Sequence, residues 1–208
     1  IMINLNQPFS FDVDVFLGCN GGGADGIAFV LQPVSTSLGS TGGGIGYQSI
    51  SPSFAVEFDT WLNSQYSDPW YNHVAIQKNG NLNHTGPSNL AGPVGFPPTG
   101  FSSIEDCQWH KAIFNWDPAT TNFTLDFDGV QILNYTGDIV NTIFNGNPNV
   151  YWGFTGSTGG ANNLQRFRFN YDLPDTTICQ NDSIIINSLT TASSFTYNWS
   201  PNYNISNN

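Results

Sequence analysis

The sequence predicts an all-β fold, an antiparallel β-sandwich, and three observations support this. Turn-forming residues, chiefly glycine, asparagine, serine and threonine, recur along the whole chain, which is typical of many short strands. Hydrophobic residues make up 39% of the 208 residues and aromatic residues 14%, which is enough for a sizeable core. No stretch shows a convincing helical periodicity.

Apolar runs between glycine-rich loops mark the strands of the first half. Residues 9–17 alternate apolar and polar side chains, the pattern of a strand with one buried face. Residues 26–31 are continuously apolar and predict a strand that is buried on both faces. After a glycine loop at 42–44, two further strands are predicted at 53–59 and 73–77.

The second half continues in the same way. Between predicted strands, the dipeptide Asp128-Gly129 favours a type I′ hairpin turn, because both central positions of that turn require a positive φ. The remaining strands are predicted at 109–116, 122–127, 150–154 and 164–169.

The composition changes near Asp172, which predicts a first domain over residues 1–172. Residues 173–208 are interpreted as a linker followed by a truncated immunoglobulin-like β segment, similar to the repeats of bacterial surface proteins. This segment is too short to bury a sandwich core of its own. We therefore expect the sequence to be part of a longer, multidomain protein.

The charge balance limits the possible partners. Only four Lys and Arg residues stand against fifteen Asp and Glu, a formal net charge of −11. Nucleic acid and anionic membrane surfaces are disfavoured, because both need cationic side chains, whereas metal cations are plausible ligands. No apolar run is long enough to span a bilayer, so no membrane insertion is expected.

The chain contains three cysteines, Cys19, Cys107 and Cys179. A disulfide between Cys19 and Cys107 would fit an oxidising compartment, with Cys179 pairing outside this sequence. Three small buried thiols are the alternative. The first interpretation predicts an extracellular or cell-surface protein.

One segment, AVEFDTWLNSQYSDPWYNHVAI at 55–76, combines strand-like apolar ends with polar residues. Glu57 and Asp59 are two apart on a strand, so both project from the same face, where like charges repel. No Lys or Arg precedes Lys78. The charges must be relieved by a raised pKa, by full exposure or by a bound cation, and flanking Phe54 and Phe58 argue against exposure.

The residue types in this segment favour a cation. Carboxylates together with the Asn63 amide and a backbone carbonyl suit Ca²⁺, whereas an added imidazole, His73, suits Mn²⁺ or Zn²⁺. The other histidines, His84 and His110, have no clear partners in the sequence. His84 is expected at the surface and His110 in a strand.

The motif VEFDTW-N, followed by Asp68 and His73, resembles the metal-binding segment of the L-type (legume-type) lectins. This resemblance implies a concanavalin A-like jelly-roll β-sandwich that binds glycans and performs no catalysis. It implies two ions, Ca²⁺ and Mn²⁺ or another transition metal. The implied ligands are Glu57, Asp59, Asp68 and His73 for the transition metal, and Asp59, Asn63, Asp68 and the Trp61 carbonyl for Ca²⁺.

Three further stretches are similar to the sugar-binding loops of that family. ADGIAFVL at 24–31 implies a sugar-binding Asp25 after a cis peptide bond, and GGGIGY at 42–47 implies a backbone donor at Gly43 or Gly44. YWGFTGSTGGANN at 151–163 implies a late loop that borders the site. The implied carbohydrate-binding residues are Asp25, Gly43, Gly44, Trp61, Asn63, Gly160 and Ala161.

Two other functions remain open at the level of sequence. A structural or protein-binding adhesin module would keep calcium for stability alone. Laminarinase-like glycoside hydrolases share the expected fold and carry Glu-x-Asp-x-x-Glu on a strand. Retaining hydrolysis needs both glutamates of this motif. Here Leu62 replaces the second glutamate, so we expect no enzyme.

Overall fold

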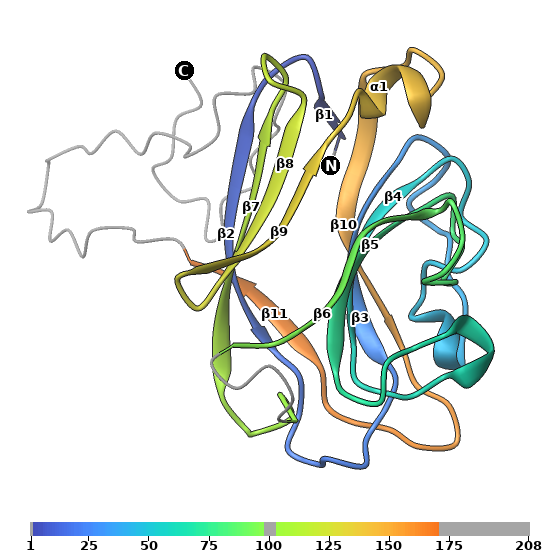
Figure 1. Cartoon of the computed structure of the whole chain (residues 1–208), viewed down its shortest axis with the longest axis vertical. Coiled ribbons are helices and arrows are strands. Elements are labelled where there is room, and N and C mark those ends of the chain that lie inside the picture. The colour runs from blue at the N-terminus through green and yellow to red at the C-terminus, as the bar shows by residue number, and fades with distance from the viewer. Residues whose placement is uncertain (1, 98–102, 171–208) are drawn as a thin grey trace, which may run out of the picture. The chain divides into compact units, whose positions relative to one another are not determined.

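Two antiparallel β-sheets face one another in the computed structural model, which describes residues 2–97 and 103–170 (Figure 1). The six-stranded sheet has the order β1 (Met2–Asn4), β10 (Asn149–Ser157), β3 (Gly26–Gln32), β4 (Phe54–Asp59), β5 (His73–Lys78), β6 (Asn89–Gly95). The five-stranded sheet has the order β11 (Arg166–Phe169), β2 (Phe9–Phe16), β7 (Trp109–Asp117), β8 (Asn122–Phe127), β9 (Val130–Thr136). The predicted all-β sandwich is confirmed.

The core between the sheets follows from the alternation along each strand. In β7, Ala112, Phe114 and Trp116 are buried while their neighbours are more exposed, and β8 buries every second residue in the same way. From the opposite sheet, Phe29 stacks on Phe114 with ring centroids 4.5 Å apart. Burial of these aromatic side chains supplies much of the apolar area that stabilises the sandwich.

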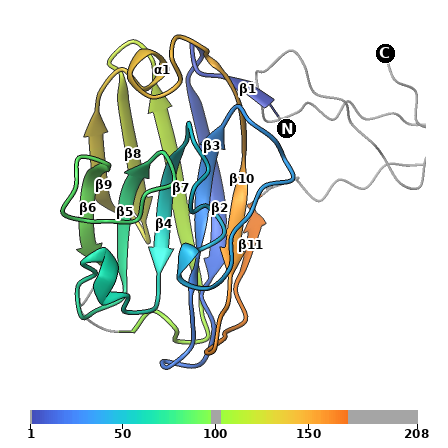
Figure 2. The ribbon, with the colours of Figure 1, turned by 90° about the vertical axis from the view of Figure 1, so that its right-hand side faces the viewer.

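A second, smaller apolar cluster covers the outer face of the six-stranded sheet. Ala28, Val30 and Ala55 lie in the sheet, and loop residues such as Tyr47 pack against them. Figure 2 shows the connection between β3 and β4 lying over this face. Consequently β4 is buried on both faces, and every one of its six residues is buried, the two acidic residues included.

The strand β6 and the helix α1 (Ile139–Thr142) were not predicted from the sequence. The edge strand β6 contains Gly92-Pro93, and proline is tolerated there because an edge strand leaves one side without ladder hydrogen bonds. The helix α1 is only one turn long, too short to show a period. The predicted turn at Asp128-Gly129 is confirmed, with φ values of 48° and 81°.

Cys19 and Cys107 form a disulfide, as the oxidising interpretation predicted. Cys179 and the expected immunoglobulin-like segment at 173–208 lie outside the described residues, so those expectations and the domain boundary at 172 stay predictions. Among the described residues, no helix has the length and apolar character needed to cross a membrane.

Candidate functional site

The pairing of β4 with β5 brings the predicted metal-binding residues together. Asp59 lies directly opposite His73 in this antiparallel register, and Glu57 lies two residues earlier on the same face. Exposure of Glu57 is 0%, of Asp59 2% and of His73 1%. Three ionisable side chains thus share a face of the sheet from which water is largely excluded.

Glu57 has one satisfied and one unsatisfied carboxylate oxygen. The Tyr47 hydroxyl donates a hydrogen bond to Oε2, whereas Oε1 has no hydrogen-bond partner although it is buried. Burial raises the pKa of Glu57 from 4.5 to about 7, against the lowering effects of His84 and Tyr47. A bare carboxylate is therefore unfavourable here, and a cation would relieve that cost.

The loop after β4 carries further buried oxygen atoms without hydrogen-bond partners. The Trp61 N–H donates to Asp59 Oδ1 over 2.8 Å, and the Asn63 N–H donates to Asp68 Oδ2 over 2.6 Å. The other Asp68 oxygen, Oδ1, and the amide oxygen of Asn63 are buried without hydrogen-bond partners. Burial, and then the charges of Glu57 and Asp68, hold the pKa of Asp59 well above its usual value.

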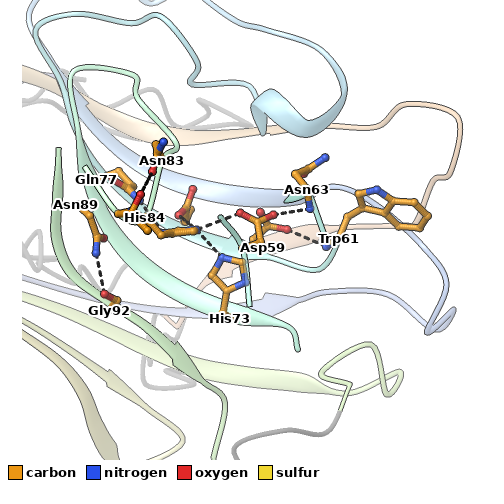
Figure 3. A network of polar contacts seen from close by, with 12 residues as sticks. Asp59, Trp61, Asn63, His73, Gln77, Asn83, His84, Asn89 and Gly92 are labelled. Carbon is orange, nitrogen blue, oxygen red and sulfur yellow. Dashed lines mark hydrogen bonds and ion pairs between the residues drawn. The ribbon is translucent and has the colours of Figure 1, made fainter. Parts of the chain in front are cut away.

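His84 also belongs to this cluster, so the expectation that it lies at the surface without a partner was wrong. Its Nε2 lies 2.8 Å from His73 Nε2, 3.4 Å from Glu57 Oε1 and 3.3 Å from Asp68 Oδ1, and its residue exposure is 8% (Figure 3). His84 follows β5 by six residues and lies in a loop, where strand periodicity gives no signal. His110 does lie in a strand, β7, but it contacts Asp106 and Asp128.

The donor atoms fit cations of two kinds. Oxygen atoms of Asp59 and Asp68 lie within 4.8 Å of each other and of His73, and the unpartnered amide oxygen of Asn63 belongs to the same loop. Carboxylate and amide oxygens suit Ca²⁺. Glu57, His73 and His84 form a second group within the same limit, and a carboxylate with imidazoles suits a transition metal.

Asp25 lies directly beside the end of β4. The peptide bond between Ala24 and Asp25 is cis, as the resemblance implied. The Asp25 N–H donates to the Ser157 carbonyl, and the Asp25 carbonyl accepts from the Thr60 N–H, each over 3.1 Å. Its Oδ2 is buried without a partner, and burial raises the pKa of this carboxyl.

The glycine turn η1 (Gly42–Gly44) packs against Asn63. A Cβ atom at Gly43 would lie 2.8 Å from the Asn63 amide, so only glycine fits at this distance without displacing it. The two predicted glycines differ, because the Gly44 N–H already donates to the Thr41 carbonyl. Gly43 is the better candidate donor.

The late loop approaches Asp25 through a residue that was not predicted. A Cβ atom at Gly159 would lie 3.5 Å from Asp25 Oδ2, whereas one at Gly160 would have nothing within 4 Å. The Ala161 carbonyl accepts from the Gly159 N–H over 3.1 Å and shapes this turn. The sequence could not show which residue of this glycine-rich loop lies next to Asp25, because adjacent glycines carry no side chains that would distinguish them.

Asn163 fixes the late loop to the disulfide-bonded loop. Its amide donates to the Asn20 carbonyl over 3.0 Å and to Glu105 Oε1 over 2.7 Å, and its oxygen accepts from the Cys19 N–H over 3.3 Å. Trp61, predicted to stack on a sugar, is 40% exposed and is not a core aromatic residue.

The family model of the legume lectin beta-barrel domain matches residues 2–171. The chain belongs to the legume (L-type) lectin family. The match covers both sheets and every residue of the cluster, and it confirms the resemblance inferred from the sequence. Membership of the L-type lectins supports carbohydrate binding as the general activity and is consistent with the absence of catalysis.

Relatives of this L-type lectin include plant and bacterial proteins. Lectin-4 of Griffonia simplicifolia is 44% identical over 64 residues, covering 27% of this chain and 26% of the relative. The serine-rich adhesin for platelets of Staphylococcus aureus (strain MRSA252) is 30% identical over 199 residues, covering 80% of this chain and 14% of the relative. The chain spans only 26% to 28% of the first three curated relatives.

Solved structures share the fold. A Griffonia simplicifolia lectin in a metal-free form has a TM-score of 0.62 at 24% identity, covering 82% of this chain and 78% of that chain. A Bauhinia forficata lectin in complex with GalNAc has a TM-score of 0.55 at 22% identity, covering 78% of this chain and 72% of that chain. The predicted jelly-roll sandwich is thus confirmed.

Proposed function

We propose that this L-type lectin domain binds glycans in a calcium-dependent manner, as the recognition module of a longer extracellular protein. The observation that carries the proposal is the convergence of Asp25, Gly43, Asn63 and Gly159 from four separate segments, beside a cluster of unpartnered carboxylate oxygens. A sugar hydroxyl both donates and accepts hydrogen bonds. Asp25 would accept, while the Gly43 N–H and the Asn63 amide would donate.

Calcium would act by positioning these groups. Its ligands would be Asp59, Asp68, the Asn63 amide oxygen and the Trp61 carbonyl, which leaves the Asn63 NH₂ group free to face the sugar. Trp61 would offer its half-exposed ring to the apolar face of the sugar. In this proposal Gly160 and Ala161 border the ligand and influence which sugar fits.

A transition metal would occupy the neighbouring position, held by Glu57, Asp59, Asp68 and His73. Either ion supplies positive charge where burial makes the carboxylates costly. The chain itself orients the carboxylates, because the Tyr47 hydroxyl and the backbone N–H groups of Trp61 and Asn63 donate hydrogen bonds to them.

A glycan array probed with the purified chain tests the proposal. We expect binding with Ca²⁺ present, none in excess EDTA, and recovery when Ca²⁺ is restored. Single open sites of this type bind one sugar weakly, on the order of millimolar, so the chain should be displayed in several copies on the probe. Equal binding in EDTA and in Ca²⁺ would refute the proposal.

A structural module with a stabilising calcium site is the second candidate, and the deep burial of the cluster favours it. It predicts that Ca²⁺ raises the melting temperature while the array stays blank. The hydrolase alternative finds less support, because Leu62 is 55% exposed in the loop after β4 and offers no proton donor. Release of reducing ends from a β-glucan would revive it.

A further inference from the structure

We infer that His84 is a direct ligand of the transition-metal position and that its imidazole makes this position selective for Zn²⁺ over Mn²⁺. The inference rests on the metal cluster of the proposed function and deepens it. It adds a ligand that lies outside the segment from which the other ligands were predicted.

The donor atoms around His84 are spaced as ligands of one ion. In a tetrahedral zinc site with bonds of about 2.0–2.1 Å, neighbouring donor atoms lie about 3.3–3.4 Å apart. His84 Nε2 lies 3.3 Å from Asp68 Oδ1 and 3.4 Å from Glu57 Oε1. Both of these oxygens lack hydrogen-bond partners, and the side chains of all three residues are 1% to 2% exposed.

The contact between the two histidines points the same way. Nε2 of His73 and Nε2 of His84 lie 2.8 Å apart. Figure 3 marks this contact with a dashed line. Without an ion, one of the two nitrogens has to carry a proton toward the other. An ion bound by both nitrogens would need them about 3.3–3.4 Å apart, roughly half an ångström farther than in this structure, with a lone pair of each directed at the ion.

Gln77 contacts the far side of the His84 ring. Gln77, which is fully buried in β5, places its amide Nε2 2.8 Å from His84 Nδ1, so in the absence of an ion the amide donates and Nδ1 accepts. An ion on His84 Nε2 would place the ring proton on Nδ1, which would then donate to Gln77 Oε1 once the amide turns, and that oxygen is buried without a partner. Metal ligands of this kind are generally oriented by a polar group on the other ring nitrogen. His73 has a similar, longer contact of 3.3 Å from Nδ1 to the Tyr71 carbonyl.

The second imidazole decides which metal fits. Carboxylates and water suit Mn²⁺, whereas imidazole suits Zn²⁺, and Mn²⁺ stands lowest in the affinity order of divalent first-row metals. Two carboxylates and two imidazoles, from Glu57, Asp68, His73 and His84, would complete a four-coordinate set. In this set His84 replaces Asp59, which the proposed function shares between the two ions, and Asp59 serves Ca²⁺ with Asn63, Asp68 and the Trp61 carbonyl.

Zinc binding to the whole chain, measured by calorimetry in saturating Ca²⁺, tests this inference. We expect Zn²⁺ to bind much more tightly than Mn²⁺, and H84N to weaken Zn²⁺ by about 100-fold or more while Ca²⁺ binding is retained. H110N is the matched control, because His110, which lies in β7 of the other sheet, is also 8% exposed and contacts two aspartates. It should leave Zn²⁺ affinity unchanged.

A second measurement needs no variant. Co²⁺ bound to the wild-type chain should give the intense visible absorption of tetrahedral coordination. Weak octahedral bands, or equal Zn²⁺ affinity in wild type and H84N, would overturn the inference. If no transition metal binds while calcium-dependent glycan binding persists, the inference fails and the proposed function stands. If Zn²⁺ binds through His84 while the array stays blank in Ca²⁺, the inference stands and the proposed function fails.

Discussion

The backbone N–H of Thr60 donates a hydrogen bond of 3.1 Å to the carbonyl oxygen of Asp25. Thr60 directly follows Asp59, the acidic residue at the end of β4. The hydrogen bond thus connects Asp25, the candidate sugar-binding residue, to the residue next to a candidate calcium ligand. We therefore expect a shift of the chain after Asp59, on loss of an ion, to reach Asp25 through this hydrogen bond.

We expect D25N to lower glycan affinity by at least about 1.5 kcal/mol, roughly tenfold, because one of the two acceptor oxygens becomes an NH₂ group, which cannot accept from a sugar hydroxyl. The fold should keep or slightly gain stability, since burial already disfavours the ionised form of Asp25. Affinity by calorimetry and melting by circular dichroism check both parts. D117N, at the exposed last residue of β7, is the control. Unchanged glycan affinity in D25N would remove Asp25 from the site.

G43A should reduce both Ca²⁺ and glycan binding while the melting temperature changes little. The added Cβ would lie 2.8 Å from the Asn63 amide, and the end of that side chain moves more easily than the backbone. Calcium titration by calorimetry measures the loss. G153A, in β10, is the matched control, because its Cβ would meet nothing within 4 Å. Normal calcium binding in G43A would contradict the proposed role of Asn63.

N163A should loosen the late loop and lower the unfolding free energy by about 2 kcal/mol, because Glu105 and the Asn20 carbonyl lose their hydrogen-bond donor. Limited proteolysis should cut near residue 160 sooner in the variant than in wild type. N134A removes an asparagine from the exposed surface of β9 and should leave the cleavage pattern unchanged. Equal protection of all three proteins would show that other contacts hold the loop.

Without metal, Glu57 should make the folded state less stable as pH rises from about 4.5 to about 7. Its folded pKa is raised, so in this window the folded chain retains a proton that the unfolded chain releases. Across the window the free energy of unfolding should therefore fall by about 3 kcal/mol. His73 opposes this, because its pKa is lowered to about 4 by burial, so acidification below 6.5 protonates the unfolded chain first.

The variant E57Q separates the two effects. In EDTA it should lose the part of the decline with rising pH that comes from Glu57, and keep the part from Asp59 and Asp25 together with the acid sensitivity of His73. Thermal unfolding across the window measures the difference between variant and wild type. In saturating Ca²⁺ and Zn²⁺ the wild-type decline should disappear, because bound ions keep the carboxylates ionised. Parallel curves for E57Q and wild type in EDTA would refute the assignment to Glu57.

Sequence patterns identified the sheets and the acidic face well, because strand alternation fixes the direction of each side chain. Glu57 and Asp59 project away from Val56 and Phe58, which lie in the core between the sheets, as predicted. The edge strand β6 could not be predicted, because its Gly-Pro pair is a turn signal unless the neighbouring strand is known.

The site was less predictable where it depends on distant loops. His84 and Gly159 enter it from segments without periodicity, and their positions follow from how η2 (Ser64–Tyr66) and the late loop pack. The His84 N–H, for example, donates to the Tyr66 carbonyl over 3.0 Å. Local sequence cannot specify such a contact, since tertiary packing decides it.

The strand order has a consequence for how the molecule is made on a ribosome. The acidic residues and both cluster histidines come from one continuous stretch between β4 and the loop after β5. All residues of the cluster are therefore synthesised before the strands of the second half of the chain. Strand β10, however, inserts between β1 and β3, more than a hundred residues after Asp25. Until that strand arrives, the Asp25 N–H lacks its Ser157 acceptor, so we expect the acidic cluster to assemble before the loop that holds Asp25 during biosynthesis.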